Sequence, residues 1–126
     1  MRDYVTFILN NEVQTLSGLA GDTTLLAWLR RARGLTGSKE GCAEGDCGAC
    51  TVVVARPDNA QSSTGPNPDG KIIWRPVNAC ILFMGMLEGA SVTTIEGLSD
   101  GAGGLHPCQQ AMVDFHASQC GFCTPG

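Results

Sequence analysis

The stretch that decides the fold is Gly41-Cys42-Ala43-Glu44-Gly45-Asp46-Cys47-Gly48-Ala49-Cys50, which runs directly into Thr51-Val52-Val53-Val54-Ala55. Glycines, cysteines and acidic side chains dominate the first ten residues, so these residues predict an irregular loop. The next five residues are mostly β-branched and apolar, and they predict a strand. A thiol-rich loop in a chain of this kind indicates metal binding.

The cysteines of this loop have the spacing C-x4-C-x2-C, and Cys80 follows after the 29 residues 51–79. This is the ligand spacing of plant-type [2Fe–2S] sites, in which four thiolates hold two irons. Gly41, Gly45 and Gly48 let the backbone approach such a core without a Cβ clash, and their N–H groups can point at sulfur. A structural zinc site is an alternative, although zinc folds usually have two close cysteine pairs. Unliganded thiols are a third interpretation.

A second cysteine pair occurs in Cys120-Gly121-Phe122-Cys123. A single C-x-x-C motif fits half of a cluster site, half of a zinc site or a redox dithiol. A helix is predicted before the motif rather than a βαβ unit, which argues against a thioredoxin-like site. Two cysteines cannot complete a four-ligand site, so the missing pair is expected beyond Gly126 or on another chain.

The flanking sequence predicts an α+β unit over residues 1–96. A helix is expected to start after an N-cap at Asp22-Thr23 and to end before Gly34, with three arginines at its exposed C-terminal end, namely Arg30, Arg31 and Arg33. Residues 56–70 are rich in Pro, Ser, Asn, Asp and Gly and predict a surface loop. A turn is expected at Asn10-Asn11, and strands are expected over residues 4–9, 13–16, 51–55, 71–74 and 92–95.

The C-terminal part has a different pattern. Residues 97–104 predict a linker, and Pro107 suits the first position of a helix. An apolar stripe at helical spacing follows, consisting of Cys108, Ala111, Met112 and Phe115. Cys108 is therefore interpreted as a small buried hydrophobe rather than a ligand. His106 is expected to flank the helix start, and His116 to lie on its polar side. An amphipathic helix alone has nothing to pack against, so this segment is expected to be loose in isolation.

The composition limits the possible functions. With 126 residues and 43% hydrophobic content, the chain can bury the core of one ordinary domain or two very small ones. A net charge of −4 argues against a nucleic-acid partner, because phosphate binding needs a basic excess. No apolar run is long enough for a membrane helix, and the first residues lack a secretory signal. We therefore expect a soluble, cytoplasmic protein, whose 7 cysteines favour metal binding over disulfides.

The motifs together resemble one known family. Thr36-Gly37-Ser38-Lys39-Glu40 and the cysteine loop that follows, as far as Val52, look like the first cluster loop of the molybdenum hydroxylases, in particular of xanthine dehydrogenase. Val77-Asn78-Ala79-Cys80 resembles the segment that supplies the fourth ligand. Residues 105–126 resemble the start of a second, helical [2Fe–2S] domain. The resemblance covers nearly the whole chain, and two linked motifs in the right order are more specific than either alone.

The resemblance implies a ferredoxin-like β-grasp domain over residues 1–96, a linker over residues 97–104, and the truncated start of an all-α domain over residues 105–126. It implies that Cys42, Cys47, Cys50 and Cys80 hold one [2Fe–2S] cluster on the FAD side. Cys120 and Cys123 would be half the ligands of a second cluster nearer molybdenum, and Gln119 would contact the pterin. Unlike the family, this chain lacks the downstream C-x-C pair, has Cys108 in place of an aliphatic residue, and has a longer loop over residues 56–70.

By the same resemblance, electrons would pass from a purine at a molybdopterin centre through both clusters to FAD and NAD. FAD and molybdopterin are expected on partner domains or subunits, because this chain has no segment for them. No residue of the chain is expected to be catalytic. Two other functions fit parts of the sequence: a free ferredoxin-type electron carrier, and a zinc-stabilised interaction module.

Overall fold

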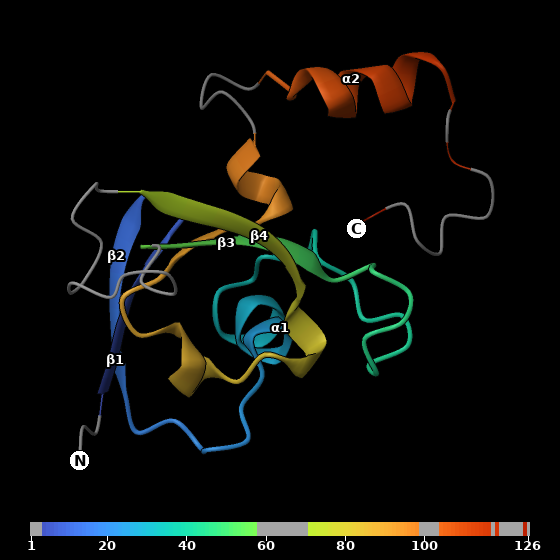
Figure 1. The fold of residues 1–126 in the computed structure, drawn as a ribbon. Helices are drawn as coiled ribbons and strands as arrows, with labels where there is room; N and C mark the ends of the chain where they lie inside the picture. Colours follow the sequence, from blue (N-terminus) through green and yellow to red (C-terminus); the bar gives the residue numbers. More distant parts are fainter. Residues whose placement is uncertain (1–3, 58–70, 99–103, 117, 119–124, 126) are drawn as a thin grey trace.

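The computed structural model describes residues 4–57, 71–98, 104–116, 118 and 125. In this part of the chain five strands form one sheet with the order β2-β1-β5-β3-β4 (Figure 1). β1 pairs with β5 in parallel, and the other neighbours are antiparallel. The strands are β1 (Tyr4–Leu9), β2 (Glu12–Ser17), β3 (Thr51–Pro57), β4 (Ile72–Asn78) and β5 (Ser91–Thr93). A mixed sheet with few helices agrees with the predicted α+β class.

The N-terminal hairpin forms as predicted. Every second residue of β1 is buried, namely Val5, Phe7 and Leu9, because alternate side chains of a strand face the core. Asn10 and Asn11 form the two-residue turn with φ of 47° and 72°, and asparagine tolerates this left-handed conformation. β2 is one residue longer at each end than predicted, because its pairing with β1 runs along the full length of that strand.

The first helix begins at α1 (Leu25–Ala27) and widens at once into a π-helix, η1 (Trp28–Ala32). Its N-cap is Thr24, whose Oγ1 accepts a hydrogen bond from the Ala27 N–H at 3.1 Å. The prediction of a cap at Asp22-Thr23 is therefore wrong. Thr24 is the last extended residue because it forms a β-bridge with Phe83, a contact between distant parts of the chain. Gly34 follows the helix with φ +67°, as expected.

The core lies between this helix and one face of the sheet. Phe7 of β1 meets Trp28 edge-to-face, with ring centroids 5.6 Å apart, a favourable geometry for two aromatic rings. Leu25 and Leu29 are fully buried in the same cluster. Three short 3₁₀ helices complete the unit: η2 (Ala79–Ile81), η3 (Met84–Leu87) and η4 (Ile95–Leu98). The core thus comes from residues distributed between Val5 and Val92.

β3 and β4 are longer than the sequence predicts. Their antiparallel pairing runs from Thr51 opposite Asn78 to Pro57 opposite Ile72. Arg56 and Pro57 therefore belong to a strand rather than to the predicted loop, while residues 58–70 lie outside the described residues. The extension of β4 to Asn78 matters for the site, because this strand ends two residues before Cys80.

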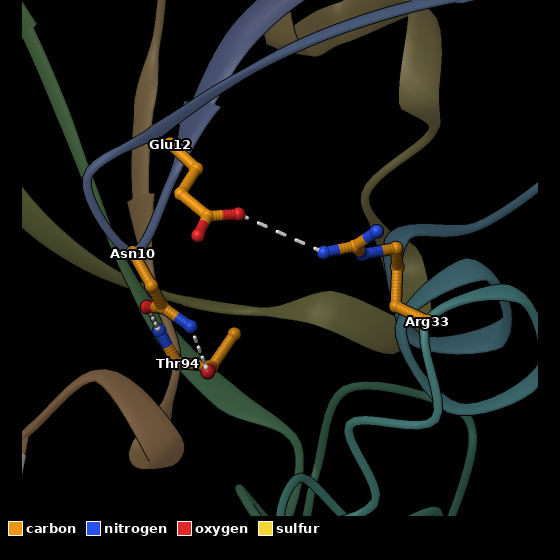
Figure 2. Close-up of polar contacts among 4 residues, drawn as sticks. All are labelled: Asn10, Glu12, Arg33 and Thr94. Carbon is orange, nitrogen blue, oxygen red and sulfur yellow. Dashed lines mark hydrogen bonds and ion pairs between the residues drawn. The ribbon is translucent and has the colours of Figure 1, made fainter.

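The strand predicted over residues 92–95 ends earlier, at Thr93. Thr94 is held by Asn10, which accepts from the Thr94 N–H and donates to Thr94 Oγ1, both at 2.9 Å (Figure 2). Ile95 then starts η4. Figure 2 also shows the ion pair of Arg33 with Glu12 at 3.9 Å, which is solvent-exposed and adds little stability.

The last helix is α2 (Pro107–Asp114), drawn in orange above the sheet in Figure 1. Pro107 is its first residue, and His106 caps it by accepting the Cys108 N–H at 3.1 Å. Both predictions are confirmed. The predicted burial of Cys108 is wrong, because α2 has no buried residue and Phe115 is 80% exposed. The described residues place no apolar surface over the stripe.

None of the helices in the described residues is long and apolar enough to cross a bilayer.

Candidate metal centre

Two chain segments carry the first four cysteines. Cys42, Cys47 and Cys50 lie in the loop of residues 38–50, which connects η1 to β3, and Cys80 lies in η2 directly after β4. The pairing of β3 with β4 brings these segments together, since Thr51 is opposite Asn78. The Ala79 N–H also donates to the Cys50 carbonyl at 3.3 Å. The register of one antiparallel ladder therefore sets where the fourth cysteine lies.

The four thiols lie in two pairs. The side chain of Cys42 neighbours that of Cys47, and the side chain of Cys80 neighbours that of Cys50. In the described part of the chain, no three cysteine, histidine or acidic side chains converge as they would around one metal ion. Two pairs of thiols in neighbouring segments are the donor set that two irons need, each with two cysteines. A single zinc ion would need at least three donors around one point.

The loop points several backbone N–H groups at sulfur. Cys42 Sγ accepts from Glu44, Asp46 and Cys47 at 3.4, 3.2 and 3.3 Å. Cys47 Sγ accepts from the Ala49 N–H at 3.4 Å. Such a concave set of N–H groups binds anionic groups. The site can therefore stabilise negative charge on thiolate sulfur without a cationic side chain.

Residues with left-handed backbone conformation let the loop curve so that its N–H groups point at sulfur. This conformation occurs at Ala43, Gly45 and Gly48, with φ of 57°, 86° and 72°. Gly45 and Gly48 suit these positions, because glycine adopts positive φ without steric cost. Gly41 does not take this conformation, and the non-glycine residue Ala43 does so instead.

Cys42 and Cys80 differ in acidity. Hydrogen bonds from the backbone of Glu44, Cys47 and Asp46 lower the pKa of Cys42 to about 7. Burial, followed by the contact with Cys50, raises the pKa of Cys80 to about 11. Metals bind the thiolate form of cysteine. A fraction of Cys42 is therefore ready to bind a metal at neutral pH, whereas Cys80 must first release its proton.

The contacts that hold residues 36–38, where the cysteine loop begins, were not predicted from the sequence. Arg30, expected at an exposed helix end, is only partly exposed and donates from Nη1 to the carbonyls of Thr36 and Ser38, both at 2.9 Å. From the other side, Glu96 Oε2 accepts the Gly37 N–H at 2.7 Å. A Cβ on Gly37 would lie 2.3 Å from Ile95 Cγ2, so this position requires glycine. Nothing in the sequence distinguishes Arg30 from Arg31 and Arg33, so the arginine that makes these contacts could not be predicted.

Asn78 is a second missed residue, since its Nδ2 donates to the Gly45 carbonyl at 2.9 Å. The remaining predicted site residues, Gln119, Cys120 and Cys123, lie outside the described residues. Cys108 is exposed on α2.

Known proteins are similar to this chain over nearly its whole length. A family model described as "2Fe-2S iron-sulfur cluster binding domain" matches residues 7–84, and one described as "[2Fe-2S] binding domain" matches residues 94–126. The xanthine dehydrogenase of Blastobotrys adeninivorans is 45% identical over 122 residues, which are 97% of this chain and 8% of that protein. The chain therefore spans less than a tenth of the length of this curated relative.

Solved structures match as well. Quinoline 2-oxidoreductase from Pseudomonas putida 86 has a TM-score of 0.73 and 32% identity, over 98% of this chain and 64% of that chain. The aldehyde oxidoreductase from Desulfovibrio desulfuricans ATCC 27774 has a TM-score of 0.70 and 38% identity, over 98% of this chain and 12% of that chain. The five-stranded mixed sheet thus matches the ferredoxin-like fold of these oxidoreductases. The chain belongs to the family of 2Fe-2S iron–sulfur cluster binding domains, the electron-transfer part of the molybdenum hydroxylases.

Proposed function

We propose that this chain holds one [2Fe–2S] cluster on Cys42, Cys47, Cys50 and Cys80 and relays electrons within a xanthine dehydrogenase-like molybdenum hydroxylase. The observation that carries the proposal is that three backbone N–H groups are directed at Cys42 Sγ, in a loop that the pairing of β3 with β4 brings to the segment of Cys80. A bound cluster supplies one-electron chemistry, which no side chain of this site can perform.

The protein residues tune and protect this chemistry. Reduction adds negative charge at the site, and the N–H groups directed at sulfur favour that charge, so they raise the reduction potential. Cys50 is 2% exposed, so this ligand position is closed to water. The proposed role of the chain is electron relay rather than catalysis on an organic substrate.

A second iron–sulfur unit is the finer part of the proposal. We assign residues 1–96 to a β-grasp domain, residues 97–104 to a linker and residues 105–126 to a segment of a helical domain. Two separate family matches, over residues 7–84 and 94–126, support a division into two units. Cys120 and Cys123 would then be half the ligands of a second cluster, and Gln119 would lie near the pterin. A free ferredoxin-type carrier leaves the match over residues 94–126 unexplained.

The proposed partners are FAD-binding and molybdopterin-binding domains or subunits of the same cytoplasmic complex. The support is that this chain matches only 8% of a xanthine dehydrogenase. Electrons from a purine or related heterocycle would pass through the two clusters toward FAD and NAD.

Iron and acid-labile sulfide analysis of the anaerobically purified chain, with an EPR spectrum after reduction, tests the first cluster. We expect about two irons and two sulfides per chain and a single rhombic signal, as one plant-type cluster implies. A colourless protein with stoichiometric zinc and no iron would favour the zinc-stabilised module instead. About four irons with two signals would mean that the second site also fills.

A further inference from the structure

The peptide unit between Gly45 and Asp46 is hydrogen-bonded at both of its ends. Its carbonyl oxygen, on Gly45, accepts from Asn78 Nδ2 at 2.9 Å. Its N–H, on Asp46, donates to Cys42 Sγ at 3.2 Å. A trans peptide is planar, and its C=O and N–H point in opposite directions, so fixing one end fixes the other. The amide of Asn78 and the sulfur of Cys42 are therefore coupled through one rigid group.

This peptide unit lies in neither a helix nor a strand. Gly45 has φ +86°, and a Cβ there would lie 3.4 Å from Ile81 Cδ1, so its backbone rests against the segment that carries Cys80. Asn78, by contrast, is the last residue of β4 and is paired with Thr51. A side chain on the rigid end of the sheet thus orients a peptide in an irregular loop.

We propose that Asn78 is a positioning residue that directs the Asp46 N–H at Cys42 Sγ and thereby raises the reduction potential of the cluster bound there. This inference rests on the proposed function, since it concerns the first [2Fe–2S] cluster. The physical reason is that an N–H donor at a ligand sulfur stabilises the reduced, more negative state. Hydrogen bonds in a chain also polarise one another, so the Asn78 contact strengthens the bond to sulfur.

The N–H groups of Glu44 and Cys47 also donate to Cys42 Sγ, at 3.4 and 3.3 Å. A donor that stabilises the thiolate also stabilises added charge on a cluster whose iron that thiolate ligates. Without the Asn78 amide the peptide can rotate away, and this stabilisation is lost.

The test is a redox titration of the full chain, followed by EPR, on the wild type, Asn78→Ala and Asn78→Gln. The control is Gln14→Ala, which removes an amide from β2 at the opposite edge of the sheet. For Asn78→Ala we expect unchanged iron content and an approximately tenfold lower ratio of reduced to oxidised cluster at a fixed solution potential, as loss of one ordinary hydrogen bond predicts. For one electron this is a shift of about 59 mV to more negative potential. Asn78→Gln keeps an amide donor and is expected to recover most of the shift, and Gln14→Ala to match the wild type.

The exchangeable proton coupled to the reduced cluster gives a second readout. ENDOR spectra in H₂O and D₂O are expected to lose one strongly coupled proton in Asn78→Ala and to keep it in Gln14→Ala.

Each outcome decides the inference. Equal potentials of the wild type and Asn78→Ala would overturn it. If Asn78→Ala fails to bind a cluster, a loaded Asn78→Gln with near-wild-type potential supports it, and failure of both variants to load overturns it. A wild-type chain without a [2Fe–2S] cluster would refute the proposed function itself, before any Asn78 variant is compared.

Discussion

In the described residues, the two regions that carry cysteines differ in how far their surroundings are buried. The loop with Cys42, Cys47 and Cys50 runs between a buried helix and a buried strand, and Cys50 is 2% exposed. Helix α2, which carries Cys108, has no buried residue. The sheet therefore positions the first site. By contrast, no described residues pack over the apolar stripe of α2. The predictions below test this difference.

Cysteine variants give the largest expected contrast. Cys47→Ser removes one of two thiols needed by one iron, so we expect near-complete loss of bound iron and of the [2Fe–2S] absorption. Cys108→Ser changes an exposed side chain on α2, so iron content is expected to stay at the wild-type level. Iron analysis and visible spectra of both purified variants check this pair. A full, unaltered spectrum of Cys47→Ser would refute its assignment as a ligand.

Phenylalanine variants extend the contrast to stability. Phe7 is 1% exposed and contacts Trp28, so Phe7→Ala is expected to cost about 3–5 kcal/mol of unfolding free energy. Phe115 is 80% exposed, so Phe115→Ala is expected to change the unfolding free energy by less than about 0.5 kcal/mol. Urea denaturation of the two variants measures both values. Similar losses would mean that α2 is packed as firmly as the sheet.

Two glycines give a smaller contrast: Gly97 lies in η4, the last described element before α2, and Gly85 lies in η3. A Cβ on Gly97 would lie 2.1 Å from Asn10 Oδ1, and the hydrogen bonds to Thr94 keep that side chain from moving away. Gly97→Ala is therefore expected to destabilise the fold by about 1–3 kcal/mol, as overpacking does. A Cβ on Gly85 would meet nothing within 4 Å, so Gly85→Ala serves as the control. Equal melting temperatures of the two variants would contradict this account of Gly97.

Thiol acidity gives the finest contrast, within the first region itself. The thiolate is the reactive form, so the alkylation rate of a cysteine rises as the pH passes through its pKa. In the metal-free chain, Cys42 is expected to reach half-maximal reactivity near its lowered pKa of about 7. Cys80 is expected to stay unreactive until the pH approaches its raised pKa of about 11. Iodoacetamide labelling with peptide mass spectrometry measures both profiles, and matching profiles would show that the backbone donors do not act on Cys42.

Local features of the fold were predictable from the sequence. The Asn10-Asn11 turn, the strand after Cys50 and the Pro107 helix start each depend on neighbouring residues, and all three are present. Cysteine spacing likewise indicates a two-iron site, because it reflects how the loop must bend.

Contacts between distant residues could not be predicted in this way. Thr24 rather than Asp22 or Thr23 caps the helix because of a bridge to Phe83. Arg30 and Asn78 bind backbone carbonyls, which every residue carries, so no sequence pattern marks their partners. The stripe on α2 shows which face a helix would bury, but whether that face is covered depends on the rest of the structure.

The most direct test of the central claim is the iron and sulfide content of the chain with Cys108, Cys120 and Cys123 all changed to serine. The claim is that the other four cysteines form a complete site. We predict about two irons and two sulfides per chain, with the EPR signal of the unaltered protein. Loss of iron or a changed signal in this variant would contradict the claim, because the first cluster would then depend on Cys108, Cys120 or Cys123.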